Sequence, residues 1–152
     1  MRNRKLNRKR GYDYSQDGWY FFTTLIKDRT NWFGEIMDGK VRLNKFGKIV
    51  KECWYDLPNH YINCVLDEFI VMPNHVHGII CIDNTVGMKN KNHNLSEMVR
   101  AFKTFSSRRI NEIVSDNDER FCWQKSFHDR IIRTDDELYY TRNYIKNNPI
   151  SP

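Results

Sequence analysis

Two histidines two positions apart stand out in the run Met72-Pro-Asn-His75-Val76-His77-Gly78. On a β-strand, successive side chains alternate between the two faces, so His75 and His77 would share one face while Val76 points into the core. Two neighbouring imidazoles can supply two ligands to one divalent metal and leave positions for a third protein ligand and a substrate oxygen. The same spacing also occurs in histidine pairs without a common role, and the pattern alone leaves both interpretations open.

A second group of chemically capable residues lies near the end of the chain. Tyr144 and Asn148 are four residues apart, so a helix would place them on one face, one turn from each other. The amide oxygen of Asn148 suits a hard cation such as Mg²⁺ or Mn²⁺, and the phenol oxygen of Tyr144 is a potential covalent nucleophile. Tyr139 and Tyr140 are close by, and spacing alone does not separate catalysis from packing among the three tyrosines.

Positive charge is concentrated at the start of the chain. The formal net charge of the 152 residues is +6, and six basic residues within the first ten account for all of it. We therefore expect a basic flexible arm, residues 1–10, followed by one domain, residues 11–152. Such an arm suits the phosphates of a nucleic acid, because each neutralised phosphate releases counterions. A solubilising tail is the alternative. The arm residues expected to bind are Arg4, Lys5, Arg8, Lys9 and Arg10.

Composition excludes several classes of protein. With 39% hydrophobic and 29% charged residues, the chain is neither disordered nor of low complexity. No stretch approaches the roughly 18 consecutive apolar residues of a membrane span, and the basic start is not followed by the apolar segment of a secretory signal. We expect a cytoplasmic protein with no membrane partner.

Hydrophobic periodicity and capping signals predict the elements that must position these residues. Strands are expected at 19–25, 65–72, 75–82 and 127–132, a small hairpin around Asp38-Gly39 within 33–43, and helices over 45–59, from 95 after Asn94, and from Thr134 to Pro149. Without the small hairpin and the last helix, this order predicts an α+β fold: a ferredoxin-like (split βαβ) antiparallel sheet with two core helices on one face. The inserted hairpin and a C-terminal helix complete it, and the crevice under that helix is the expected place for chemistry.

The helix that begins after Asn94 combines an apolar face with a basic one. Arg100, Lys103 and Arg108 fall largely on the side away from its apolar residues. We expect these three residues to contact phosphates, although a charged stripe can also be no more than a solvated surface.

The block Met72-Pro-Asn-His75-Val76-His77-Gly78, together with the ending Tyr144-Ile-Lys-Asn-Asn148-Pro149, resembles the histidine-hydrophobic-histidine single-strand DNA transposases that use one catalytic tyrosine. Within that group the chain is most similar to the REP-associated tyrosine transposases, and the resemblance extends over almost the whole sequence. One departure concerns the strand at 127–132, where relatives commonly carry a histidine and this chain has Arg130, with His128 two residues earlier.

The resemblance implies an activity and a set of roles. His75, His77 and Asn148 would hold Mg²⁺ or Mn²⁺, and Tyr144 would attack a DNA phosphodiester to give a 5′-phosphotyrosine and a free 3′-hydroxyl. The partner would be single-stranded or hairpin DNA containing palindromic repeats, in a bacterial, nucleoid-associated setting. A homodimer is possible but undecided. The basic arm and the basic helix face would then bind DNA.

Two other functions use the same order of elements. A non-catalytic domain that binds single-stranded DNA or RNA could stack bases on the sheet, as RRM domains do, although the characteristic RRM sequence run is missing and histidines stand where stacking rings are expected. A metal-dependent nuclease would use water instead of tyrosine as the nucleophile.

Overall fold

The computed structural model describes residues 12–85 and 93–148, so the basic arm predicted at 1–10 lies outside the described residues. Four strands form one antiparallel sheet in the order β4-β5-β1-β6. Their bounds are β1 Gly18–Leu25, β4 Cys64–Val71, β5 His75–Ile82 and β6 His128–Ile132. The strand between residues 18 and 25 is therefore central, paired with β5 on one side and β6 on the other.

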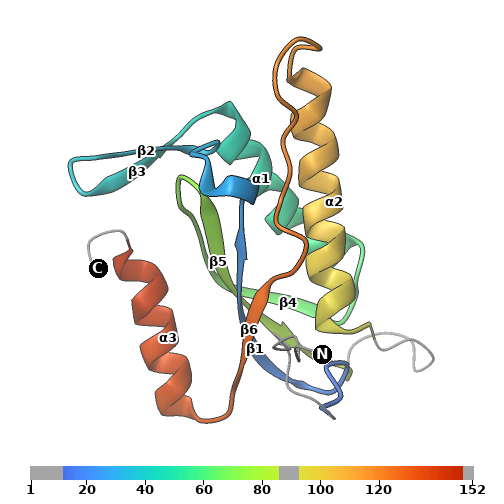
Figure 1. Cartoon of the computed structure of the whole chain (residues 1–152). Coiled ribbons are helices and arrows are strands. Elements are labelled where there is room, and N and C mark those ends of the chain that lie inside the picture. The colour runs from blue at the N-terminus through green and yellow to red at the C-terminus, as the bar shows by residue number, and fades with distance from the viewer. Residues whose placement is uncertain (1–11, 86–92, 149–152) are drawn as a thin grey trace, which may run out of the picture.

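Three α-helices cover the two faces of this sheet (Figure 1). Helices α1 (Lys45–Asp56) and α2 (Leu95–Ile113) pack together on one face, and α3 (Asp135–Asn147) lies on the other. Short 3₁₀ turns follow β1 at Lys27–Arg29 and α1 at Leu57–Asn59. This is the ferredoxin-like arrangement that the sequence predicts. In the part of the chain that the structure describes, no helix is long and apolar enough to cross a membrane.

Local signals explain where the elements begin. The side chains of Asn44, Asn94 and Thr134 each accept a hydrogen bond from the backbone N–H two or three residues on, which caps α1, α2 and α3. Strands β2 (Gly34–Met37) and β3 (Lys40–Leu43) form the predicted separate hairpin. Asp38 and Gly39 in its turn have φ of 52° and 74°, the left-handed conformation that a two-residue hairpin turn requires.

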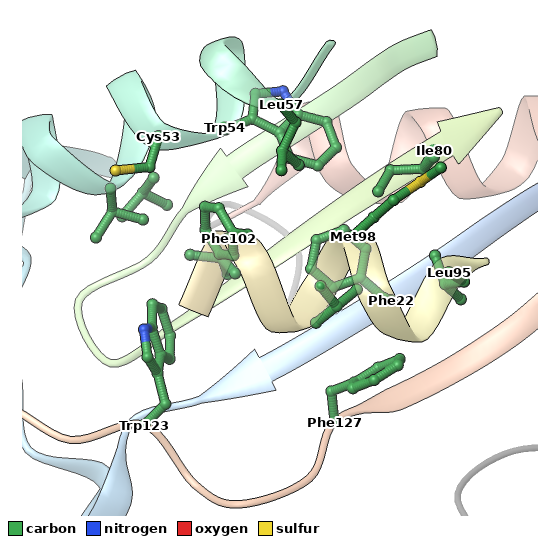
Figure 2. Packing of buried hydrophobic residues seen from close by; sticks show 14 of the residues in the cluster. Phe22, Cys53, Trp54, Leu57, Ile80, Leu95, Met98, Phe102, Trp123 and Phe127 are labelled. Carbon is green, nitrogen blue, oxygen red and sulfur yellow. The ribbon is translucent and has the colours of Figure 1, made fainter. Parts of the chain in front are cut away.

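The main core lies between the sheet and helices α1 and α2. Figure 2 shows its aromatic packing, in which Phe22 from β1, Trp54 from α1 and Phe102 from α2 meet. The rings of Trp54 and Phe69 stack with centroids 4.3 Å apart. Gly78 of β5 makes room for them, because a Cβ there would lie 2.8 Å from Phe22 and 3.1 Å from both Phe69 and Trp54. This face of the sheet is filled with side chains.

Strand β4 contains a bulge opposite β5. Leu66 pairs with Ile80 and Phe69 pairs with Gly78, so three steps along β4 match two steps along β5. The extra residue lets Asp67 and Glu68, although consecutive, both form ion pairs with α3, to Arg142 at 2.8 Å and to Lys146 at 3.6 Å. The bulge therefore helps to hold α3 over the sheet. Leu66 and Phe69 both pack against the main core.

Candidate active site

The face of the sheet beneath α3 gathers the residues that the sequence singled out. Val76 is fully buried in the main core, as the alternation predicts, so His75 and His77 lie on the α3 face. Beside them on β1 lie Thr23 and Phe21, since Thr23 pairs with His77 in the register between β1 and β5. Together these residues form a row across two central strands.

His77 lies on the face opposite the main core, as the alternation predicts, and is nevertheless buried. Only 7% of its surface is exposed, because its ring stacks on Phe21 with centroids 5.6 Å apart and meets the edge of Tyr144 at 5.3 Å. Helix α3, which carries Tyr144, covers this part of the sheet. His75 is partly exposed, and its ring lies 4.7 Å from that of His77.

Each histidine has one ring nitrogen held by a neighbour. Nδ1 of His75 is 2.7 Å from Oδ1 of Asn74, and Nδ1 of His77 is 2.8 Å from Oγ1 of Thr23. Such bonds fix the ring orientation and leave Nε2 as the ligand atom. Burial and, secondarily, the nearby His75 lower the pKa of His77 to about 4. Burial and then the charge of Arg29 lower the pKa of His75. Both rings are thus neutral near pH 7, the form that binds metal.

The three tyrosines of α3 differ in their ring contacts and in their distance from the histidine pair. Tyr144 is in ring contact with both His77 and Phe21, and its side chain remains 44% exposed, which leaves the phenol accessible. Tyr140 is more exposed and lines the same cavity. Tyr139 packs only on Tyr140 among the ring contacts of the described residues. Tyr144 is therefore the tyrosine adjacent to the histidine pair.

Asn148 sits at the end of α3, where its side-chain Nδ2 donates to the carbonyl oxygen of Tyr144 at 2.8 Å. It lines a smaller pocket with Ile70 and Val71 of β4, the residues paired with His77 and Val76. Within residues 12–85 and 93–148, no hydrogen bond joins Asn148 to either histidine, and no three His, Cys, Asp or Glu side chains converge as a metal site. The structure therefore brings His75 and His77 together and places the third candidate ligand, Asn148, beside the neighbouring strand β4.

An open cavity of about 990 Å³ lies at this face and extends to the sheet edge at β6. Its lining includes His77, Tyr144, Arg130, Thr23 and Thr141. Arg130 and Thr141 were not identified as site residues from the sequence. The sequence marks Arg130 as a departure on the last strand but gives it no role, because its place in the cavity depends on the pairing of β6 with β1, which no local pattern encodes.

The predicted basic helix face lines a different groove, of about 830 Å³, between α2 and the chain segment 120–127. Arg100 and Arg108 are exposed there, and Arg120 and Lys125 add two cations that the sequence reasoning missed. Lys103 has a structural partner: its Nζ donates to the backbone oxygen of Gln124 at 2.5 Å. Burial lowers the pKa of Lys103. This lysine therefore anchors the segment that forms the opposite wall of the groove.

Comparisons with known proteins agree with this architecture. A family model described as "Transposase IS200 like" matches residues 17–148. An uncharacterized protein of Haemophilus influenzae is 32% identical over 168 residues, which cover 99% of this chain and 90% of that protein.

Two solved structures share the fold. One is described as the structure of the REP-associated tyrosine transposase bound to a REP hairpin; it is 18% identical with a TM-score of 0.66, over 95% of this chain and 73% of that one. The other is a putative transposase from Deinococcus radiodurans, 19% identical with a TM-score of 0.54, over 93% and 97% of the two chains. The structure of the REP-associated tyrosine transposase thus confirms the expected fold, the family model confirms the expected transposase family, and the chain belongs to the IS200-like transposase family.

Proposed function

We propose that the protein is a metal-dependent transposase that cleaves and rejoins single-stranded DNA at hairpin-containing sites through a 5′-phosphotyrosine intermediate. The observation that carries the proposal is the contact between Tyr144 and His77 in one open cavity, with His75 beside them. A hydroxyl nucleophile next to two neutral imidazoles whose Nδ1 atoms are held by neighbours is an arrangement suited to phosphoryl transfer.

Two imidazoles and one amide oxygen are the proposed ligands of a divalent cation, and of these the amide oxygen is the one that suits a hard cation. Thr23 and Asn74 orient the two imidazoles, and the amide oxygen of Asn148 is the proposed third ligand. Bound Mg²⁺ or Mn²⁺ would polarise the scissile phosphate and stabilise charge on the leaving oxygen.

The transfer step balances without an external energy source. Oη of Tyr144 forms a bond to phosphorus while the bond from phosphorus to O3′ breaks; the phenol proton is released and O3′ takes up a proton to become a free hydroxyl. The new bond has the energy of a phosphodiester, so the 3′-hydroxyl of the same or another strand can attack it in reverse and rejoin the DNA.

Hairpin DNA is the proposed partner. The REP-associated relative is described as bound to a REP hairpin, and this chain offers two surfaces for such a ligand. The cavity beside Tyr144 would take the cleaved strand, and the basic groove with Arg100 and Arg108 would bind phosphates of the stem. The arm at residues 1–10 is proposed to add further phosphate contacts.

A binding module without catalysis is the weaker alternative. RRM-type domains stack bases on an open sheet face, whereas α3 covers the face that carries Phe21 and His77. The covered face disfavours stacking across the sheet and favours a reaction site between the sheet and α3.

The test uses single-stranded oligonucleotides that tile the DNA flanking the gene, labelled at the 3′ end and incubated with protein and Mg²⁺ or Mn²⁺. A 5′-phosphotyrosine keeps the 3′-labelled fragment on the protein through a denaturing gel. Tyr144→Phe deletes one oxygen and should lower adduct formation at least about a thousandfold. It should leave DNA affinity unchanged.

Tyr139→Phe is the matched control, because Tyr139 is on the same helix but outside the cavity. It should form the adduct at the wild-type rate. Labelled fragments that run free of protein would instead identify a nuclease that uses water, and binding without cleavage across all oligonucleotides would identify a binding module.

A further inference from the structure

Arg130 lines the cavity and forms no ion pair with any described residue, although Asp129 and Glu137 line the same cavity. In the described part of the chain, Arg109 and Arg142 form ion pairs with Glu52 and Asp67, whereas Arg130 has no carboxylate within 4.0 Å. A guanidinium carries five N–H donors. Within residues 12–85 and 93–148, the side chain of Arg130 donates one hydrogen bond, from Nη2 to Oγ1 of Thr141 at 2.8 Å, so most of its donors remain for a ligand.

The guanidinium is nevertheless held in place. Thr141 is 3% exposed, and its hydroxyl donates to the backbone oxygen of Glu137 at 2.7 Å, which leaves a lone pair of Oγ1 to accept from Arg130. The Cζ atom of Arg130 also lies 5.2 Å from the ring centre of Phe21, within cation–π range. A buried hydroxyl and an aromatic ring thus orient an exposed cation.

Phe21 links Arg130 to the reacting groups. Its ring stacks on His77 at 5.6 Å and contacts the edge of Tyr144 at 6.3 Å. Thr141 lies three residues before Tyr144, on the same face of α3. His77, Tyr144 and Arg130 therefore surround one ring and line one cavity, with the histidine on β5 and the arginine on β6, on opposite sides of β1.

We infer that Arg130 is a catalytic residue that donates hydrogen bonds to a non-bridging oxygen of the scissile phosphate, on the side away from His75 and His77. This inference rests on the proposed function. Arginine is suited to the role because its planar fork matches a phosphate and it keeps its proton throughout. The bond changes stay those of the tyrosine transfer: Arg130 exchanges no proton and stabilises the charge that accumulates on the phosphoryl oxygens.

The experiment compares single-turnover adduct formation by wild type, Arg130→Gln and Arg130→Lys at saturating DNA, on an oligonucleotide that the wild type cleaves. We expect Arg130→Gln to slow the step about a hundredfold, the scale for loss of one transition-state donor, while DNA affinity changes less than about threefold. Arg130→Lys keeps the positive charge but loses the planar guanidinium, so its rate of adduct formation should lie between those of the wild type and Arg130→Gln. Arg109→Gln removes one positive charge on the α1–α2 side and should match the wild type.

A second measurement separates phosphate contact from a structural role. Sulfur replaces either non-bridging oxygen of the scissile phosphate, giving two diastereomers. In the wild type, we expect one diastereomer to react slowly in both Mg²⁺ and Mn²⁺, since its sulfur lies at the Arg130 position. That difference between the two diastereomers should disappear in Arg130→Gln. Because the ratio compares two substrates on one protein sample, partial unfolding of the variant cancels.

The outcomes are distinct. A rate for Arg130→Gln within about threefold of the wild type, or an unchanged diastereomer ratio in that variant, overturns the inference and leaves the tyrosine mechanism standing. Failure of the wild type to form any adduct refutes the proposed function itself. A slowed rate with loss of the diastereomer preference confirms the phosphate contact.

Discussion

The two faces of the sheet are built differently. On the α1–α2 face, aromatic side chains such as Phe22, Trp54 and Phe102 interlock in a continuous core. On the α3 face, the buried hydrophobic cluster consists of Ile79, Ile132 and Ile145, and ion pairs to the β4 bulge hold the helix. One face therefore supplies most of the buried aromatic packing, while the other leaves space for a cavity and holds α3 through a smaller hydrophobic cluster and two ion pairs.

The largest effect is expected on the core face. Phe102→Ala removes a fully buried ring that contacts Phe22, Trp54 and Trp123, and should lower the free energy of unfolding by about 3–5 kcal/mol. Denaturant titration measures this loss. Adduct formation per folded molecule should stay at the wild-type value. A Phe102→Ala protein that keeps its stability but forms no adduct would show that the core face does not supply stability independently of the α3 face.

The next effect concerns the histidine pair. His75→Ala and His77→Ala should each slow cleavage about a hundredfold or more, because changes to the surroundings of a metal ligand alone cost roughly ten- to a hundredfold. Removal of metal with EDTA should have the same result. His60→Ala, at the exposed end of the 3₁₀ turn that follows α1, serves as the control.

The two histidine variants should differ in stability. His77 is 7% exposed and packs on Phe21 and Tyr144, so His77→Ala should cost about 1–2 kcal/mol, within the ordinary range for a buried contact. His75→Ala should lower the free energy of unfolding by less, because His75 is partly exposed. Equal melting temperatures for the two variants would show that α3 does not pack tightly over His77.

A smaller effect is expected at the basic groove. Replacing Arg100 and Arg108 together with Gln should reduce the slope of log affinity against log salt by about 1.4–1.8, since each phosphate contact contributes about 0.7 for single strands and 0.9 for duplex. The rate of adduct formation at saturating DNA should not change. A slope equal to that of the wild type would mean that the groove is only a solvated surface.

The smallest effect concerns the contact between β4 and α3. Burial alone would raise the pKa of Asp67, but the hydrogen bonds from Arg142 and from the backbone of Glu68, with the charges of Arg142 and Lys146, together lower it. Asp67 therefore contributes stability above its unfolded pKa of about 4, and this contribution is lost as pH falls through the lowered folded value. Because Arg142 is 37% exposed, we expect Asp67→Asn to cost only about 1 kcal/mol at pH 7.

Denaturant titrations of wild type and Asp67→Asn at several pH values check this expectation. The difference between the two proteins should shrink as pH is lowered below about 4. Hydrogen exchange should quicken in α3 and stay unchanged in α2. Faster exchange in both helices would show that the two faces unfold together.

Sequence patterns predicted most of the fold because its signals are local. Asn94 and Thr134 cap their helices, and Asp38-Gly39 turns the hairpin, through contacts within three residues. The inward direction of Val76 follows from strand alternation alone. These features need no knowledge of the rest of the chain.

The environment of the site was harder to predict because it depends on distant pairing. Burial of His77 requires α3 to cover it, and the place of Arg130 requires β6 to pair with β1, with Phe21 opposite Arg130 across more than a hundred residues. Lys103 looked like a free cation on a helix but binds the backbone of Gln124. The metal and the tyrosine mechanism stay predictions.

The bulge in β4 has a consequence for changes in chain length. Asp67 and Glu68 together stand where a regular strand would have one residue opposite Ile79, between the pairs Leu66–Ile80 and Phe69–Gly78. A deletion of Glu68 would restore simple alternation, with Leu66 and Phe69 still facing the core and only the ion pair to Lys146 lost. A deletion inside β5 would instead exchange the faces of the residues that follow it. Strand β4 can therefore lose one residue without reversing its faces, whereas β5, which carries His75 and His77, cannot.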